Sequence, residues 1–232
     1  MSFDLIATHY RWIETLTFGN ALQRARTCWI PDIPRPKHAL VIGEGNGRFL
    51  RELLRAHPKI RIDCLDLSTK MLTLAQRRAS EICSNPCQLI RFIHEDVRNW
   101  VAQRSYDLVV THFFLDCFRR DELKTIITKL AAAATPNAIW LVADLAIPAD
   151  EGLARAHAKL WLRVMYWFVG SVTGISAVEL VDPSPYLQTN GFKCVSSQVS
   201  HARMVKSELW QRNGTICQAN FSPTAAAIHH PV

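Results

Sequence analysis

Short apolar runs and longer stretches with helical spacing alternate along much of the 232-residue chain. Mostly apolar runs predict buried strands, because a strand covered on both faces has little room for polar side chains. Apolar residues at steps of three and four predict helices between these strands. The strand-like runs lie at 39–42, 60–65, 87–94, 106–110 and 138–145. This alternation predicts an α/β fold, with a parallel sheet covered by helices on both faces.

A glycine turn follows the first predicted strand. Gly43, Gly45 and Gly47 are spaced two residues apart, and a helical pattern beginning at Phe49 comes directly afterwards. A strand that turns through glycines into a helix exposes backbone N–H groups to a ligand, as adenosine-bearing cofactors require. The dinucleotide fingerprint G-x-G-x-x-G would need a glycine at position 48, which is Arg48. The spacing therefore disfavours a nicotinamide dinucleotide, and an ordinary tight turn is the alternative.

Asp66 ends the second predicted strand, 19 residues after Gly47. A carboxylate at that place can accept hydrogen bonds from both hydroxyls of a ribose. The alternative is that Asp66 only precedes Ser68, a residue type that caps helices well.

Four segments, taken in order, resemble motifs of the class I S-adenosylmethionine-dependent methyltransferases. They are the G-x-G-x-G turn at 43–47, the segment from Asp66 to Leu72, Asp96 after the third strand, and Tyr106-Asp107 at the start of the fourth. In that family an acidic residue after the third strand faces the exocyclic amine of adenine, and Asp96 matches it. A turn aspartate is the alternative for Asp96.

The resemblance implies a Rossmann-like, seven-stranded sheet that is mostly parallel and closes with an antiparallel C-terminal hairpin. The hairpin strands are expected at 192–199 and 204–210. The implied cofactor is S-adenosyl-L-methionine. The residues implied to bind it are Gly43, Glu44, Gly45, Gly47, Asp66, Leu67, Met71, Asp96, Val97 and His112.

The chain departs from the family at one position. The family usually has an acidic residue two positions before the first glycine, where it helps to hold the ammonium group of the cofactor; here the residue is Val41. Glu44, inside the glycine turn, can supply this charge instead, or it can be a solvated turn residue.

The pattern divides the chain into five parts. We expect an N-terminal helical cap at 1–36, a cofactor-binding core at 37–150, a helical insertion at 151–180, C-terminal strands at 181–213 and a tail at 214–232. The insertion is apolar on nearly all sides, so it must be covered. It is interpreted as a lid or acceptor wall, with a core helix, a dimer contact and a membrane-surface helix as alternatives.

Composition limits the partners and the compartment. Apolar residues make up 49% of the chain and charged residues 20%, which is typical of a soluble globular protein. The net charge of +7 comes from scattered basic residues, which argues against nucleic acid as a partner. Seven cysteines without paired spacing, and no secretory signal pattern, favour reduced thiols in the cytoplasm. We expect no metal site and no transmembrane segment; the oligomeric state is left open, with a homodimer as one option.

Methyl transfer from a sulfonium needs alignment, water exclusion and, for some acceptors, a base, but no enzyme nucleophile. Open α/β sheets bind ligands at the carboxyl ends of their strands, which restricts the candidates for a base. His112 follows the fourth strand and Asp144 lies near the end of the fifth, so they are the predicted catalytic residues. A hydrogen-bonded core histidine is the alternative for His112.

The sequence thus predicts a methyltransferase acting on a small metabolite with an apolar or aromatic body. The alternatives are an RNA or tRNA methyltransferase, a nicotinamide-dependent oxidoreductase on a similar fold, and a cofactor-binding protein without catalysis.

Overall fold

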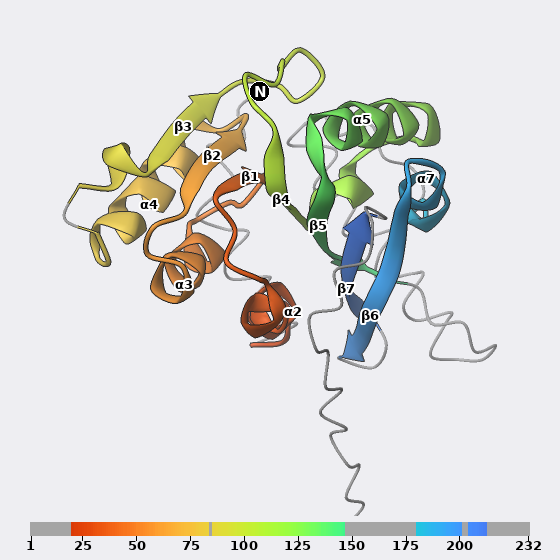
Figure 1. The fold of residues 1–232 in the computed structure, drawn as a ribbon, viewed down its shortest axis with the longest axis horizontal. Coiled ribbons are helices and arrows are strands. Elements are labelled where there is room, and N and C mark those ends of the chain that lie inside the picture. The colour runs from red at the N-terminus through yellow and green to blue at the C-terminus, as the bar shows by residue number, and fades with distance from the viewer. Residues whose placement is uncertain (1–19, 84, 147–179, 201–203, 213–232) are drawn as a thin grey trace, which may run out of the picture.

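The computed structural model describes residues 20–83, 85–146, 180–200 and 204–212. These residues form a seven-stranded sheet in the order β3-β2-β1-β4-β5-β7-β6 (Figure 1). The strands are β1 (His38–Ile42), β2 (Arg61–Asp66), β3 (Ile90–His94), β4 (Tyr106–His112), β5 (Ala134–Leu145), β6 (Phe192–Ser200) and β7 (Val205–Arg212).

The sheet is parallel from β3 to β5, and β7 runs antiparallel to both β5 and β6. The Rossmann-like α/β fold, with a mostly parallel sheet and an antiparallel C-terminal hairpin, is confirmed. The order reverses direction at β1, because the chain passes from β3 at one edge back to β4 beside β1. Such a switch point is where open α/β sheets bind ligands, at the carboxyl ends of the strands.

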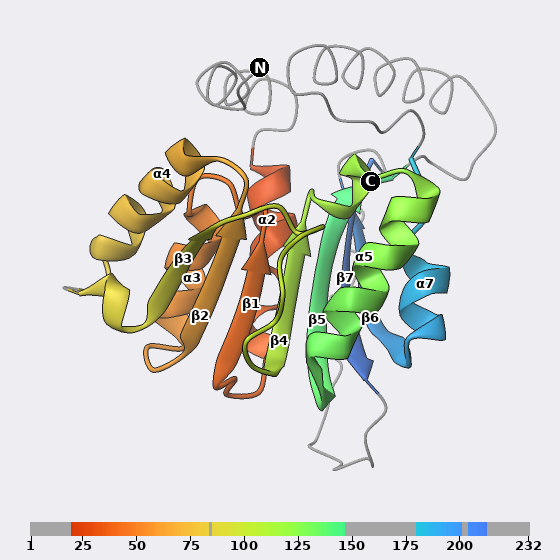
Figure 2. The ribbon, with the colours of Figure 1, turned by 90° about the horizontal axis from the view of Figure 1, so that it is seen from above.

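Helices lie on both faces of the sheet, as Figure 2 shows. The longer helices between strands are α3 (Arg48–Ala56), α4 (Thr69–Ser80) and α5 (Arg120–Ala133). The shorter elements are α2 (Ala21–Thr27), α7 (Ser184–Thr189) and the 3₁₀ turns η2 (Ile30–Asp32), η3 (Pro86–Gln88) and η4 (Leu115–Cys117).

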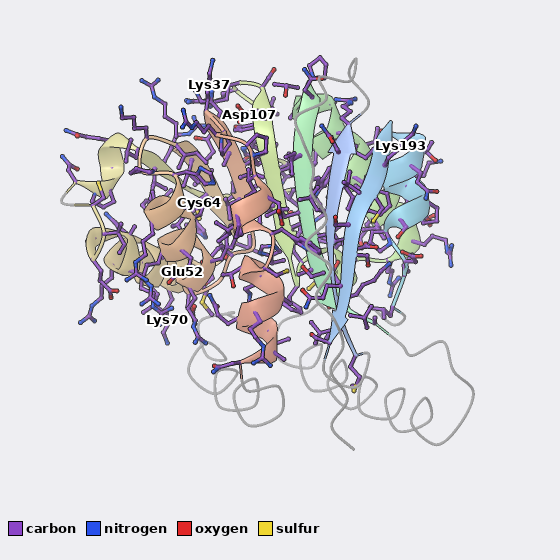
Figure 3. The ribbon with its side chains drawn as sticks, turned by 60° about the horizontal axis from the view of Figure 1, so that its bottom comes forward. Lys37, Glu52, Cys64, Lys70, Asp107 and Lys193 are labelled. Atoms are coloured by element: carbon purple, nitrogen blue, oxygen red, sulfur yellow. The ribbon has the colours of Figure 1, made fainter. Side chains whose placement is uncertain are left out.

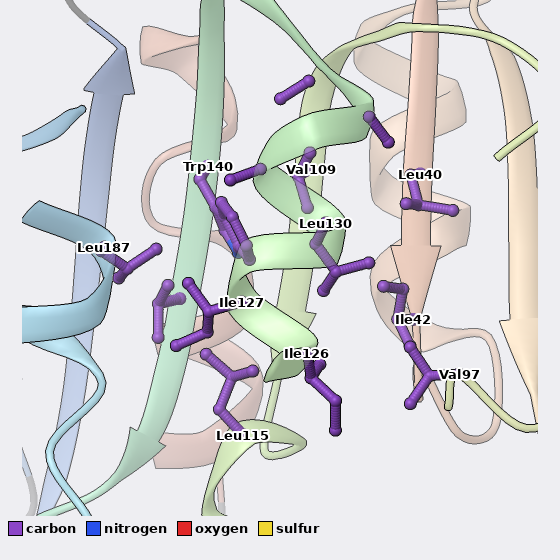
Figure 4. Close-up of a cluster of buried hydrophobic side chains, with 14 of the residues drawn as sticks. Leu40, Ile42, Val97, Val109, Leu115, Ile126, Ile127, Leu130, Trp140 and Leu187 are labelled. Carbon is purple, nitrogen blue, oxygen red and sulfur yellow. The ribbon is translucent and has the colours of Figure 1, made fainter. Parts of the chain in front are cut away.

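The core on one face is built where α5 and α7 pack on the central strands (Figure 4). Alternate residues of β1 and β4, such as Leu40 and Val109, meet the apolar side of α5 there. Ile126, Ile127 and Leu130 recur on α5 at steps of one, three and four, so they form one stripe toward the sheet. Burial of these side chains stabilises the fold by roughly 1.5–3 kcal/mol each.

The opposite face is covered by α3 and α4, while α2 packs against the ends of β5 and β7. Ser207 of β7 ties α2 to the sheet. Its hydroxyl donates to the carbonyl of Ala25 at 2.6 Å and accepts from the indole N–H of Trp29 at 2.9 Å. The described N-terminal residues are therefore anchored to the last strand of the chain.

Several predicted boundaries are wrong. The third strand begins at Ile90 and not at residue 87, because a proline-led 3₁₀ turn occupies 86–88. The fifth strand begins at Ala134 and not at residue 138, because α5 ends at Ala133 and Pro136 lies inside β5, where the pairing with β4 bulges. A bulge tolerates a residue that lacks an N–H.

The predicted cap at 1–36 and insertion at 151–180 lie largely outside the described residues, as does the tail at 214–232, and the domain division stays a prediction. In the described part of the chain, no helix has the length and apolarity needed to cross a membrane. Those residues also contain no cluster of three or more His, Cys, Asp or Glu side chains placed to hold a metal ion. The six described cysteines are free thiols.

Candidate cofactor and acceptor site

The three glycines after β1 all adopt positive φ, but their surroundings differ. Their φ angles are 62°, 72° and 84° for Gly43, Gly45 and Gly47. A Cβ on Gly43 would lie 2.6 Å from the Phe114 ring, and one on Gly47 would lie 2.6 Å from the Cα of Ala75. A Cβ on Gly45 would meet no atom within 4 Å. Gly43 and Gly47 therefore allow close packing, whereas Gly45 borders open space where a ligand can approach the backbone.

Glu44 is buried and faces the N-terminus of α3. Its carboxylate accepts hydrogen bonds from the backbone N–H groups of Gly47, Phe49 at 2.7 Å and Leu50 at 3.2 Å. Burial raises the pKa of Glu44 to about 7, and the nearby Arg26 charge opposes that shift. The interpretation of Glu44 as a solvated turn residue is wrong, because its side chain substitutes for the missing cap of α3. Its role toward a cofactor stays a prediction.

Asp66 lies beside the glycine turn at the carboxyl end of β2. One of its oxygens accepts the N–H of Ser68 at 2.8 Å, and the Ser68 hydroxyl caps α4 by accepting the N–H of Met71 at 3.2 Å. Burial raises the pKa of Asp66, while the N–H groups of Ser68 and Gly45 lower it. Leu67, the next residue, is 48% exposed. An acid and an exposed apolar side chain thus adjoin the open space at Gly45.

Asp96 already has a charged partner. Its carboxylate pairs with Arg98 at 2.6 Å and accepts the backbone N–H of Arg98 at 2.9 Å. This pair lowers the pKa of Asp96. The arrangement is that of a turn aspartate, and binding of adenine by Asp96 stays a prediction. Val97, which was also predicted to bind cofactor, is buried in the core beside Ile42 (Figure 4).

Lys129 of α5 holds the turn that contains Asp96. Its ammonium group donates to the carbonyls of Val97 at 3.2 Å, Arg98 at 2.7 Å and Trp100 at 3.0 Å. No local sequence pattern indicates this contact, because it joins residues about 30 positions apart. The turn after β3 is therefore fixed to α5 before any ligand binds.

His112 and Asp144 lie on opposite faces of the sheet. Residues paired in register in a parallel sheet share a face, and successive residues of a strand alternate between faces. His112 is in register with Ala143, so Asp144 faces away from it. The His112 ring contacts Phe49 of α3 edge-on, with 4.7 Å between centroids. The two predicted catalytic residues therefore cannot act as a directly bonded pair.

His112 is 3% exposed, and neither ring nitrogen has a hydrogen-bond partner. Burial, and to a lesser degree the charge of Arg26, hold the pKa of His112 well below its usual range. The imidazole is therefore neutral near pH 7. The alternative of a hydrogen-bonded core histidine is wrong in one respect, because the ring is buried but not hydrogen-bonded.

Arg26 is a residue of this site that the sequence did not indicate. Its guanidinium lies 4.7 Å from the ring centroid of Phe113, and its charge lowers the pKa values of both Glu44 and His112. Phe113 has a φ of 53°, an uncommon conformation for an aromatic residue. Arg26 comes from α2, outside all four recognised segments, so only tertiary packing brings it to the glycine turn.

The chain was compared with known proteins. Residues 39–137 match a family model described as "Methyltransferase domain". Over 110 residues, 46% of this chain and 38% of the relative, it is 30% identical to a malonyl-[acyl-carrier protein] O-methyltransferase of Halalkalibacterium halodurans. Over 75 residues, 31% of this chain and 34% of the relative, it is 31% identical to a tRNA (guanine-N(7)-)-methyltransferase of Enterococcus faecalis. The chain thus aligns with little more than a third of either curated relative.

Solved structures resemble this one over more of their length. The magnesium protoporphyrin IX methyltransferase of Synechocystis PCC 6803, with bound SAH, superposes with a TM-score of 0.60 at 20% identity. That match covers 83% of this chain and 82% of the other. At this identity the likeness shows the fold, and it agrees with the seven-stranded sheet described above.

Proposed function

We propose that this chain, whose residues 39–137 match a methyltransferase domain, is a class I S-adenosylmethionine-dependent methyltransferase that transfers a methyl group to a small acceptor with an apolar or aromatic body. The observation that carries the proposal is the open space at Gly45, beside the carboxylate of Asp66. A glycine in left-handed conformation with no neighbouring atom provides room for an adenosyl group. The adjacent acid provides acceptors for the ribose hydroxyls.

The proposed cofactor site extends along the carboxyl ends of β1, β2 and β4. Leu67 and Met71 lie beside Asp66 and would cover the adenine ring, with Asp96 and Val97 on the following turn. Gly43 and Gly47 shape the turn, and Glu44 fixes it to α3 through three backbone N–H groups. The cofactor supplies an electrophilic methyl group on a sulfonium, so the chain's residues need only orient the acceptor and exclude water.

The proposed acceptor side follows β4 and β5. Three phenylalanines, Phe113, Phe114 and Phe118, follow β4 in the chain, and the rings of Phe114 and Phe118 meet edge-on with 5.0 Å between centroids. Aromatic side chains provide apolar contact area for an organic acceptor. Basic residues are scattered along the sequence, which supports a small acceptor over a polyanion. Three of them, Lys37, Lys70 and Lys193, are labelled in Figure 3 and lie apart.

His112 and Asp144 remain the proposed groups for accepting a proton from the acceptor, and they would act from different faces of the sheet. A neutral imidazole can accept a proton, and both nitrogens of His112 lack partners. An acceptor that approaches from the α3 face would use His112. An acceptor that approaches from the α5 face would meet Asp144.

The location is also part of the proposal. The six described cysteines are free thiols, and unpaired thiols fit the reducing cytoplasm.

The experiment is a transfer assay with methyl-labelled S-adenosylmethionine. The purified protein is incubated separately with a cell metabolite extract and with total tRNA, and label is followed by chromatography. The proposal expects label in a small molecule and none in tRNA. Gly45→Val serves as the inactive control, and Lys193→Ala, on the distant edge strand β6, as the matched active control. Label that enters tRNA alone, or label transfer that survives in Gly45→Val, contradicts the proposal.

A further inference from the structure

Asp144 is a buried acid without a hydrogen-bond partner. The residue is 7% exposed, and neither carboxyl oxygen has a partner. It lies one residue before the end of β5, on the α5 face of the sheet. Buried polar atoms are nearly always paired, so an unpaired buried carboxyl near a strand end is an exception that requires a reason.

Other acids surround Asp144. Asp116 of η4 is buried, and its charge is, after burial itself, the largest cause that raises the pKa of Asp144. Glu208 of β7 raises it further, while the nearby backbone N–H groups of Phe113 and Phe114 lower it, although neither meets hydrogen-bond geometry toward the carboxyl oxygens. Burial, and after it the charges of both aspartates, raise the pKa of the Cys117 thiol beside Asp116. The titratable groups facing this place from η4 and β7 are therefore mostly acidic.

The lysine beside Asp144 in the sheet does not form an ion pair with it. Lys206 is paired in register with Asp144 across β5 and β7. Its ammonium group nevertheless binds Glu208 at 2.6 Å, and the second oxygen of Glu208 accepts the indole N–H of Trp210 at 3.2 Å. Both carboxylate oxygens of Glu208 thus have partners, and the ammonium group of Lys206 is paired with Glu208 and not with Asp144.

We propose that Asp144 binds an amine group of the acceptor, so that the acceptor is an amine carried on an apolar or aromatic body. This inference rests on the proposed function and names the chemistry of its acceptor. A positively charged donor satisfies the orphaned carboxyl and offsets the repulsion from Asp116. A neutral hydroxyl provides a hydrogen bond but no charge, so it offsets less of the repulsion between Asp144 and Asp116.

The binding event changes a protonation state. Burial and the charges of Asp116 and Glu208 raise the pKa of Asp144. An ammonium group bound beside the carboxyl lowers that pKa again, so protonated carboxyls give their proton to solvent as the ion pair forms. Amine binding is therefore coupled to proton release, whereas binding of a neutral alcohol is not.

The experiment uses the full chain saturated with S-adenosylhomocysteine. 2-Phenylethylamine and 2-phenylethanol, which differ only in the donor group, are titrated by calorimetry in two buffers of different ionisation enthalpy. We expect the amine to bind at least about tenfold more tightly than the alcohol, the scale of one charge-assisted hydrogen bond. We also expect proton release with the amine alone.

Variants separate recognition from structure. Asp144→Asn should remove the preference for the amine and the proton release, with unchanged affinity for S-adenosylhomocysteine. Asp144→Leu should raise the midpoint of thermal unfolding, because it removes an unpaired buried acid. The matched control is Asp182→Asn, which loses the same charge near Lys206 from a residue bonded to Ser184, and it should keep the preference.

Equal affinity for amine and alcohol in protein that binds S-adenosylhomocysteine overturns this inference and leaves the proposed function intact. An amine preference that survives in Asp144→Asn also overturns it. Failure of the wild-type protein to bind S-adenosylhomocysteine at all contradicts the proposed function itself.

Discussion

Gly45 and Gly47 provide a matched pair of substitutions, because the two residues share a positive φ and differ in what surrounds them. In Gly45→Ala the new methyl group enters open space, so only the backbone conformation opposes it. That conformation costs an alanine about 1–2 kcal/mol. The folded protein should therefore lose about that much stability.

In Gly47→Ala the same backbone cost applies, and the new Cβ would also lie 2.6 Å from the Cα of Ala75. The obstacle is backbone within α4, which cannot rotate away, so α3 and α4 must separate locally. Overpacking of this kind costs about 1–3 kcal/mol in addition. Gly47→Ala should therefore be destabilised by about 2–5 kcal/mol.

For ligand binding the two variants should rank the other way, with the larger loss of affinity in Gly45→Ala. Gly45→Ala fills the space assigned to the adenosyl group and should weaken S-adenosylhomocysteine by at least about tenfold, or about 1.4 kcal/mol. Urea unfolding and calorimetric titration of both variants measure the two quantities. If Gly45→Ala binds the ligand with wild-type affinity while it loses the expected stability, Gly45 is only a structural turn residue and the cofactor site is misplaced.

Three further perturbations have defined outcomes. Asp66→Asn should weaken cofactor binding by about 1.5–3 kcal/mol, the worth of hydrogen bonds to a charged group, and calorimetry with unchanged affinity would exclude Asp66 from the site. Since the pKa of Glu44 rises from 4.5 to about 7 on folding, its stabilising contribution is complete below pH 4.5 and is lost as the pH rises to about 7. Unfolding free energies measured across that window should show this slope, and Glu44→Gln should lack it; an identical slope in the variant refutes the assignment. Ser207→Ala should cost about 1–3 kcal/mol, because it leaves the Trp29 indole unpaired and leaves the Ala25 carbonyl with only the weak Cys28 thiol donor; an unchanged urea midpoint would show that α2 is anchored otherwise.

The elements of the core could be predicted because local pattern determines them. The runs of β1 and β4 are mostly apolar, the residues of β2 alternate between apolar and polar, and the glycine turn has few alternative structures. The boundaries around Pro136 could not be predicted in the same way. That proline is tolerated by a bulge between β4 and β5, and a bulge depends on how two strands pair.

The position of a site residue could be predicted where it depends only on the end of its own strand. Asp66 and the glycine turn were expected to lie together, and they do, because both follow parallel strands at one edge of the sheet. His112 and Asp144 were expected to be candidates at the same edge. Their separation onto two faces depends on register, since a shift of one residue would reverse it.

Contacts between distant segments had no local signal. Arg26 reaches the glycine turn only because Ser207 and neighbouring apolar side chains dock α2 on the last strands. Lys129 reaches the turn after β3 only through the packing of α5. The segment at 151–180, interpreted from the sequence as a lid or acceptor wall, lies largely outside the described residues.

The central claim is that the glycine turn and Asp66 form a site for S-adenosylmethionine. The most direct test is a calorimetric titration of the wild-type protein with S-adenosylhomocysteine and, separately, with NADH. The account predicts a single saturable site for S-adenosylhomocysteine and no heat of binding for NADH. Saturable binding of NADH, with none for S-adenosylhomocysteine, would contradict it.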